Sequence, residues 1–377
     1  MRNRLAAVSL FALAASTLTI CPLTAAPAAP AAPAAPFSQA AQLSQAPSLA
    51  TAVTTPDSLN AISPPCEVTI PASGFPGDCI VITFTRRAPI IPISNATVTL
   101  LDARGKTVAR AAAFGTATDI STALLTAGTT LSGSTLAQAK PETKGFPDIV
   151  PRTPTVIAVL ALPYDLSSGQ YRIQIHYLAG TAIIADEKRF TLKARAFPSE
   201  EITFDGKNTV IKQDFGHQRL AQIDKLTAIL LRQDPASPRF TGPFVLPVKS
   251  KRRTSVFAQS RILDYSNGKK ESSTHYGIDF GVPTGTQVRA AGDGLVVMAE
   301  SRISTGWTIA IEHDPGIYSL YYHLDALLVR KGAMVHAGDL IARSGATGLA
   351  TGPHLHWEFR VNGEAVSPDW FVGRKLY

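Results

Sequence analysis

Short runs of β-branched and apolar residues, separated by turn sequences, recur along most of this chain. Runs of this kind fit buried or half-buried strands, whereas an amphipathic helix needs apolar residues three and four apart. The clearest runs in the first half of the chain are Ile80–Phe84, Ala96–Leu101, Thr155–Ala161, Tyr171–Tyr177 and Arg189–Lys193. Turn sequences such as Asp102–Gly105 and Ser167–Gly169 separate them. We therefore predict a mainly β protein whose residues 63–197 form an immunoglobulin-like β-sandwich.

The last third of the chain, 241–377, is also rich in strand patterns and in glycine. The expected strands there are Val288–Val297, Trp307–Glu312, Tyr318–Tyr322 and Leu355–Arg360. They predict a C-terminal antiparallel, barrel-like β-domain. Residues 198–240 form a connector in which Gln218–Arg232 has apolar residues at helical spacing, so we expect a short helix there. Val329–Ile341 resembles the paired hairpins of biotinyl-type carrier barrels, but the Met-Lys turn that carries the cofactor is missing.

The N-terminus has the layout of an export signal. A basic start, Met1–Arg4, precedes the apolar run Leu5–Ile20 and small residues. We predict a signal peptide over 1–28; the alternatives are an uncleaved anchor and lipidation at Cys21. The Ala/Pro-rich residues 29–62 follow as an extended, disordered tether. After that region we find no further apolar stretch long enough to span a bilayer.

Charge and cysteine content agree with export. The formal net charge is +8, which favours an anionic wall or membrane surface. No basic stripe with interleaved aromatic residues occurs, so nucleic acid is not an expected partner. Two cysteines remain after the signal, Cys66 and Cys79, and they flank a turn-rich stretch. One disulfide between them is expected in an oxidising compartment, the alternative being two buried thiols.

Histidines concentrate in the last third of the chain, which holds six of the eight. In the segment His275-Tyr-Gly-Ile-Asp279, alternate residues of a strand face the same way. His275 and Asp279 would therefore share one face, with Gly277 leaving space between them for an ion. Alone, this pattern is more often explained by a hydrogen-bonded histidine and a turn aspartate than by a metal site.

A second cluster is Gly352-Pro-His-Leu-His, in which His354 and His356 would point to one face of a strand. Two imidazoles in a half-buried sheet need polar partners, and a metal ion supplies one. His323 ends a third strand, Tyr318–Tyr322. Three protein ligands would leave the fourth position of a tetrahedral zinc site for water, which is the arrangement of a catalytic site. Spacing alone does not decide whether His354 or His356 is a ligand.

These motifs, in this order, resemble the lysostaphin-type, LytM-like zinc metallopeptidases, over about residues 241–371. That family has H-x(3)-D, a Tyr-containing strand that ends in His-Leu, and Gly-Pro-His-Leu-His near the C-terminus. The resemblance implies one Zn²⁺ per chain, held by His275, Asp279 and His356. It also implies that His323 and His354 are catalytic. No further cofactor is expected.

The implied activity is hydrolysis of peptide cross-links in bacterial peptidoglycan by zinc-activated water, in the periplasm or outside the cell. Cell-wall proteins are possible further partners. The alternative is a catalytically inactive regulator that activates another wall hydrolase, but such members have lost metal ligands, and this chain keeps all five positions. Two nearby residues are ambiguous from sequence. His313 is expected to be a turn residue, and Glu358 either contacts the site or is a surface charge.

Overall fold

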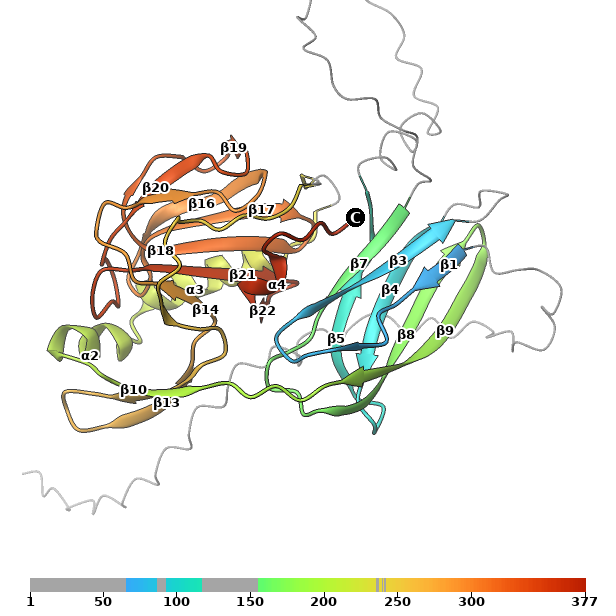
Figure 1. Ribbon diagram of the computed structural model, residues 1–377, viewed down its shortest axis with the longest axis horizontal. Coiled ribbons are helices and arrows are strands. Elements are labelled where there is room, and N and C mark those ends of the chain that lie inside the picture. Colours follow the sequence, from blue (N-terminus) through green and yellow to red (C-terminus); the bar gives the residue numbers. More distant parts are fainter. Residues whose placement is uncertain (1–65, 87–92, 117–154, 235–236, 239, 241) are drawn as a thin grey trace, which may run out of the picture. The chain divides into compact units, whose positions relative to one another are not determined.

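The computed structural model describes residues 66–86, 93–116, 155–234, 237, 238, 240 and 242–377 (Figure 1). Contacts divide the chain into Met1–Pro47 and Ser48–Tyr377, and every described residue belongs to the second unit. The predicted signal peptide and tether lie outside the described residues. Strands dominate the described part of the chain, which confirms the mainly β prediction.

The first domain is a two-sheet sandwich. One sheet has the order β1-β3-β7-β6 and the other β2-β9-β8-β4-β5. The bounds are β1 Cys66–Thr69, β2 Ser73–Gly74, β3 Cys79–Arg86, β4 Ile93–Leu101, β5 Thr107–Ala112, β6 Phe114–Gly115, β7 Thr155–Ala161, β8 Gly169–Ala179 and β9 Ala182–Leu192. Alternate residues of these strands, such as Ile82, Val98 and Ile173, are buried in one apolar cluster. The sandwich predicted from the alternating pattern is confirmed.

The expected disulfide between Cys66 and Cys79 is wrong. In the antiparallel register of β1 and β3, Cys66 lies opposite Arg86, at the other end of β3 from Cys79. A strand rises about 3.3 Å per residue, so the seven positions from residue 79 to 86 separate the two thiols by roughly 23 Å. The two buried cysteines are therefore not joined to each other. The turn-rich stretch between them therefore does not bring Cys79 opposite Cys66.

The C-terminal domain is built on a ten-stranded sheet whose main path is β11-β14-β21-β18-β17-β16-β19. β15 pairs with β20, β20 with β18, and β22 with β21. The bounds are β11 Arg253–Ser255, β14 Gly277–Phe280, β15 Gln287–Arg289, β16 Gly294–Arg302, β17 Gly306–Asp314, β18 Ile317–Leu327, β19 Met334–Val335, β20 Leu340–Ser344, β21 Leu355–Val361 and β22 Glu364–Val366. All strand pairs of this sheet in the described residues are antiparallel, as predicted.

One strand that the sequence predicted in this domain is divided into two in the structure. Residues 288–297 were expected to be continuous, but β15 ends at Arg289 and β16 begins at Gly294. The backbone of Gly294 runs against the neighbouring strand, because a Cβ there would lie 2.3 Å from the carbonyl oxygen of Glu312. Only glycine allows so close an approach.

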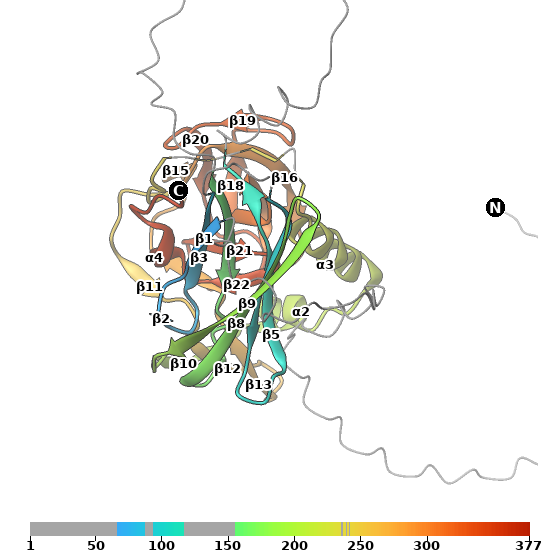
Figure 2. The same ribbon diagram turned by 90° about the vertical axis from the view of Figure 1, so that its right-hand side faces the viewer.

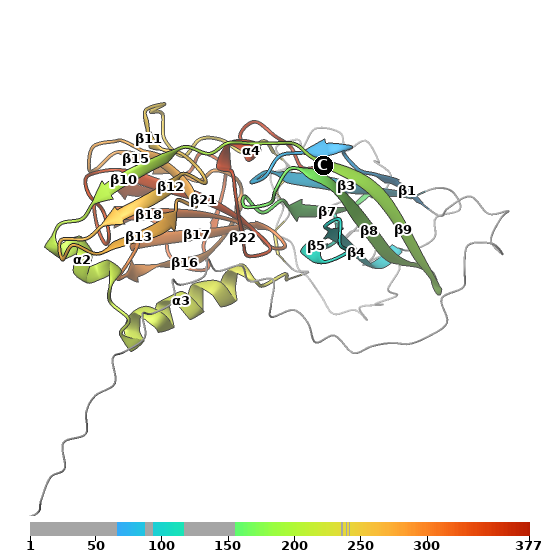
Figure 3. The same cartoon turned by 90° about the horizontal axis from the view of Figure 1, so that it is seen from below.

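A smaller sheet stands beside the large one. It has the order β10-β12-β13, with β10 Ser199–Thr203, β12 Ser260–Asp264 and β13 Lys270–Thr274. β12 and β13 form an antiparallel hairpin, whereas β10 joins β12 in parallel. Figure 3 shows these three strands together, with the short helix α2, Gly206–Lys212, following β10. The connector therefore supplies a strand as well as helices, which the sequence pattern did not predict.

Helix α3, His217–Leu230, is the amphipathic helix expected in the connector. Its buried residues Leu226 and Leu230 pack on Met298 of β16 and on Tyr318 and Leu320 of β18. Figures 2 and 3 both show the helix lying along β16. A last short helix, α4, spans Pro368–Phe371. In the described part of the chain, no helix is both long and apolar enough to cross a bilayer.

His313 is fully buried at the end of β17 and is not the turn residue that the sequence suggested. Its Nδ1–H donates to the carbonyl oxygen of Asp293 at 2.7 Å, so Nε2 accepts from the hydroxyl of Ser319 at 2.8 Å. Burial lowers the pKa of His313 from 6.5 to about 4. The neutral imidazole is thus part of the packing of the domain.

This burial predicts an acid-sensitive contribution to stability. The folded pKa lies below the unfolded value, so the unfolded chain binds the extra proton first. The contribution of His313 is complete above about pH 6.5 and is lost as the pH falls towards 4. Between pH 7 and 5, we expect the wild type to lose about 2 kcal/mol of unfolding free energy that His313→Gln does not lose. Urea denaturation at both pH values measures this, with His217→Gln at the exposed start of α3 as the matched control. Parallel pH profiles for wild type and His313→Gln would contradict the prediction.

Candidate metal centre

The pairing of β14 with β21 brings two sequence motifs together. In its antiparallel register, Asp279 lies opposite His356, and Gly277 lies opposite Glu358. Between these pairs, Ile278 faces Trp357, and both side chains are fully buried. The polar residues thus lie on one side of the two strands and the apolar ones on the other. His275 comes from the two-residue link before β14, not from the strand itself.

Three side-chain atoms of these residues converge. His275 Nε2 lies 3.0 Å from Asp279 Oδ1 and 2.9 Å from His356 Nδ1. His356 Nδ1 lies 2.9 Å from the same carboxylate oxygen. All three side chains are buried. His275, Asp279 and His356 are therefore a group that could hold a metal ion.

The other nitrogens of the two imidazoles decide where their protons lie. His275 Nδ1 is 2.9 Å from the carbonyl oxygen of Val256, which accepts but does not donate, so the ring proton is assigned to Nδ1. His356 Nε2 faces the carboxylate of Glu358 at 3.4 Å, which assigns the ring proton to Nε2. In the state in which both rings are neutral, His275 Nε2 and His356 Nδ1 direct bare lone pairs towards Asp279. Three electron-pair donors at this distance repel one another unless a cation lies between them.

The electrostatics of the group point the same way. Burial works to raise the pKa of Asp279, but hydrogen bonds from His275 and His356 hold that pKa well below its usual value. Burial lowers the pKa of His275. Burial also opposes a charge on His356, yet its bonds to Asp279 and Glu358 raise its pKa to about 9. Without a metal, the pocket thus attracts a proton to the place where the three donors meet.

The donor set fits zinc. Zinc accepts imidazole nitrogen and carboxylate oxygen at about 2.0–2.2 Å, which puts tetrahedral ligand atoms about 3.3 Å apart. The observed separations are 2.9–3.0 Å, so small outward shifts would complete the geometry. A cradle for the ring of His356 is also built in. A Cβ on Gly277 would lie 2.7 Å from His356 Nε2 and 2.4 Å from the carbonyl oxygen of Trp357.

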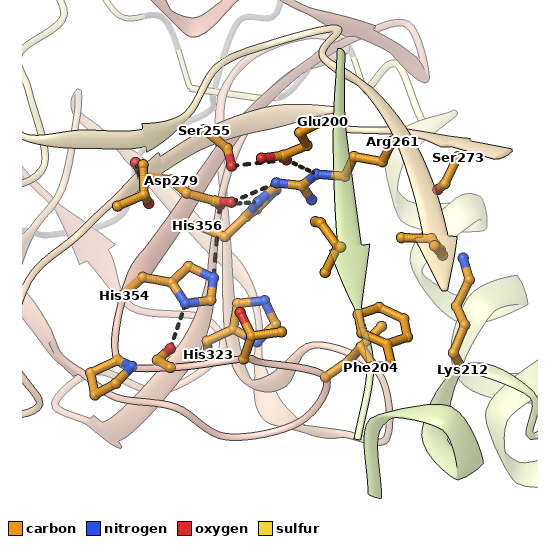
Figure 4. Close-up of a pocket in the computed structure, with 17 residues that line it drawn as sticks. Glu200, Phe204, Lys212, Ser255, Arg261, Ser273, Asp279, His323, His354 and His356 are labelled. Carbon is orange, nitrogen blue, oxygen red and sulfur yellow. Dashed lines mark hydrogen bonds and ion pairs between the residues drawn. The ribbon is translucent and has the colours of Figure 1, made fainter. Parts of the chain in front are cut away.

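His323 and His354 lie beside this group, with ring centroids 4.7 Å apart. His354 Nδ1 donates to the carbonyl oxygen of Gly352 at 2.8 Å, and its Nε2 lies 3.8 Å from Asp279 Oδ1. His323 Nδ1 donates to the carbonyl oxygen of Thr347 at 2.8 Å. In both rings the Nε2 lone pair is left available. Figure 4 shows both side chains on the same side of the pocket, below Asp279.

The position of His323 is unusual for its backbone. It has a φ of 58°, in the left-handed region that side chains other than glycine seldom adopt. Its backbone N–H donates to the carbonyl oxygen of Thr305. Burial and the neighbouring His354 and His356 lower the pKa of His323 to about 3, so the ring is neutral at neutral pH. Strained conformations of this kind persist where the surrounding structure holds them, often at functional sites.

Glu358 proves to be buried behind the group and is not a surface charge. Its carboxylate accepts a hydrogen bond from Arg360 on one side and faces His356 Nε2 on the other. Tyr322 stacks on the His356 ring, with centroids 5.1 Å apart and planes 4° from parallel. These contacts fix the orientation of the imidazole.

The group opens into a pocket of about 380 Å³. Asp279, His323, His354 and His356 line one end of it. The remaining lining includes Glu200, Phe204 and Lys212 from the connector, and Arg261 and Ser273 from the β12–β13 hairpin (Figure 4). The connector residues were missed, because their only sequence signal is one strand and one short helix between two domains.

Residues 273–368, which include all five of these histidine and aspartate positions, match the model of peptidase family M23. The C-terminal region of the chain is an M23 peptidase domain. This confirms the resemblance inferred from the H-x(3)-D and His-Leu-His motifs. The connector residues of the pocket and Arg261 precede the matched segment of the M23 domain.

Two named enzymes are similar in sequence to this domain. The peptidoglycan DD-endopeptidase ShyA of Vibrio cholerae is 41% identical over 121 residues, which are 32% of this chain and 28% of ShyA. The DD-carboxypeptidase/endopeptidase Mpg of Neisseria meningitidis is 43% identical over 94 residues, which are 25% of this chain and 22% of Mpg. The chain thus spans less than a third of the length of these relatives. A crystal structure of a putative M23 peptidase from Pseudomonas aeruginosa is similar, with 26% identity and a TM-score of 0.44, over 59% of this chain and 80% of that one.

Gly277 gives a direct test of the cradle. In Gly277→Ala, the new methyl group meets the carbonyl oxygen of Trp357 and the ring of His356. We expect a loss of about 1–3 kcal/mol of unfolding free energy from overpacking, together with weaker zinc binding because the imidazole is displaced. Gly206→Ala is the control, since a Cβ there meets nothing within 4 Å. Denaturation and chelator competition measure the two effects. Zinc affinity equal to that of the wild type in Gly277→Ala would show that the ring does not need this space.

Proposed function

We propose that this protein is a zinc-dependent endopeptidase that hydrolyses the peptide cross-links of bacterial peptidoglycan. The observation that carries the proposal is the convergence of three ligand-type atoms, from His275, Asp279 and His356, at one end of a pocket, with two further imidazoles beside them. A structural zinc site is closed by four protein ligands, whereas three ligands at an open pocket are typical of a catalytic one.

The proposed metal ligands are His275 through Nε2, Asp279 through Oδ1 and His356 through Nδ1. When bound there, zinc supplies Lewis acidity, which polarises a scissile carbonyl and lowers the pKa of water from about 15.7 towards 7. Glu358 accepts a hydrogen bond from His356 Nε2–H and so keeps Nδ1 of that ring directed into the site.

His354 and His323 are the proposed catalytic residues. Their Nδ1 protons are committed to the backbone carbonyls of Gly352 and Thr347, so each ring can accept a proton or a hydrogen bond only at Nε2. His354 lies closer to the ligand group and is the proposed acceptor of the water proton. Once protonated, its Nε2–H can donate to the developing oxyanion or pass the proton to the departing amine. His323, in contact with it, orients the water.

The substrate class comes from the relatives. ShyA is named as a peptidoglycan DD-endopeptidase, and Mpg as a DD-carboxypeptidase/endopeptidase. Cross-link peptides of the wall are the substrate that these names share with the motif-based prediction. The formal net charge of +8, or about +6 without Arg2 and Arg4 of the signal peptide, suits an anionic polymer.

We further propose that the chain is exported, with the periplasm as its place of action. The signal layout of residues 1–28 and the tether of 29–62 support this, as does a substrate that lies outside the cytoplasm. In the proposed domain organisation, the sandwich of 63–197 and the connector of 198–240 precede the peptidase domain of 241–377.

Two histidine variants separate metal binding from catalysis. His356→Ala should lose both zinc and digestion of purified sacculi, because a ligand is gone. His354→Ala should keep zinc but lose a factor of about 10²–10⁴ in rate, the usual contribution of a general base. His336→Ala, at an exposed turn outside the pocket, is the control for both. Metal content and mass spectrometry of the released fragments, with and without chelator, are the measurements.

Two results would decide against the proposal. Undiminished digestion by His356→Ala would exclude the ligand assignment. Release of no peptide fragments by the zinc-loaded wild type would exclude the enzyme and favour a binding protein that acts on another wall hydrolase.

A further inference from the structure

A chain of charged groups leads from the connector to the candidate metal ligand Asp279. Arg261 Nη2 donates to Asp279 Oδ2 at 3.0 Å, and Arg261 Nε donates to Glu200 Oε1 at 2.7 Å. The hydroxyl of Ser255 donates to the same oxygen of Glu200 at 3.2 Å. Figure 4 shows these groups at the edge of the pocket, with Arg261 between the two carboxylates.

The backbone builds this contact. β10 runs parallel to β12, and their register sets Glu200 beside Arg261. Both residues lie outside the segment 273–368 that matches the M23 family. The contact therefore comes from how this chain adds its connector strand to the β12–β13 hairpin.

The two oxygens of Asp279 have different partners. Oδ1 faces His275 Nε2 and His356 Nδ1, whereas Oδ2 receives the guanidinium. The side chain of Asp279 is 9% exposed and that of Arg261 18%. A carboxylate held on one oxygen by a planar guanidinium cannot rotate freely, and so presents the other oxygen in a fixed direction.

Glu200 balances the charge of this arrangement. A guanidinium close to a divalent cation is repelled by it, and that repulsion is strong where solvent is scarce. The carboxylate of Glu200 offsets the charge of Arg261 and holds its Nε, so that Nη2 stays on Asp279.

We infer that Arg261, held by Glu200, is a positioning residue that sets the carboxylate of Asp279 for metal binding and so tunes the affinity of the site. This inference rests on the metal site of the proposed function. It differs from a role in substrate binding, in which Arg261 would bind a carboxylate of the wall peptide from the pocket.

The test uses the full chain and zinc alone. Arg261→Gln should weaken zinc binding by about tenfold or more, measured by competition with a chromophoric chelator, because residues that orient a ligand typically contribute this much. The zinc affinity of Arg261→Lys should lie between those of the wild type and Arg261→Gln. An ammonium group keeps the charge but cannot bind both carboxylates in the same plane. The spectrum of the cobalt-substituted protein should change in Arg261→Gln, which reports the ligand geometry directly.

Glu200→Gln tests the same series of charged groups at the end away from Asp279. It should weaken zinc binding by a smaller factor, about threefold, and this effect should disappear in the Arg261→Gln background because Glu200 acts through Arg261. The matched control is Arg253→Gln, which breaks a similar arginine–carboxylate pair between Arg253 of β11 and Asp369 of α4. Its zinc affinity should equal that of the wild type.

Three outcomes would overturn the inference. Unchanged zinc affinity in Arg261→Gln with a raised KM for wall peptides would assign Arg261 to substrate binding. Equal losses in Arg261→Gln and Arg253→Gln would indicate general destabilisation. Additive effects of the Glu200 and Arg261 variants would mean that the two act separately. If Arg261→Gln does not fold, Glu200→Gln alone carries the test. Zinc affinity needs no substrate, so a failure to digest sacculi would remove the proposed activity and leave this result standing.

Discussion

The antiparallel register of β14 and β21 is the constraint on which the candidate site depends. It places Asp279 opposite His356 and Gly277 opposite Glu358, while Ile278 and Trp357 fill the core on the other face. A shift of one residue would exchange the two faces and bury the ligands among apolar side chains. The burial of Ile278 and Trp357 therefore stabilises the domain and fixes the metal group with the same set of contacts.

Much of this arrangement could be predicted from spacing, since His275 and Asp279 are four residues apart and His354 and His356 two apart, and even spacings place strand residues on one face. The prediction was less accurate in detail, because His275 and His354 lie just outside the strands and reach the site from the adjoining links. The sequence pattern also could not separate His354 from His356. In the structure the difference is physical. Glu358 accepts a hydrogen bond from His356 Nε2–H, and the carbonyl oxygen of Gly352 accepts one from His354 Nδ1–H, so different ring nitrogens face the site.

Contacts that depend on the pairing of strands far apart in the sequence could not be predicted from the sequence. Glu200 and Arg261 are sixty-one positions apart, and only the parallel pairing of β10 with β12 makes them neighbours. The same holds for Cys66 and Cys79, which are close in sequence but are placed at opposite ends of β3 by their register. His313 gave no sign of its complete burial, because polar residues in a strand do not reveal which of them have partners inside the domain.

The parallel strand β10 has a consequence for how the domain is delimited. The recognisable family segment begins at residue 273, yet the wall of the pocket begins at Glu200. A fragment cut at the family limits would retain all five candidate site positions, but would lose the partner of Asp279 Oδ2 and one edge of the pocket. The part of the chain that encloses the pocket is thus larger than the segment that matches the family, and segments outside the motifs are available to adjust the surroundings of the candidate ligands.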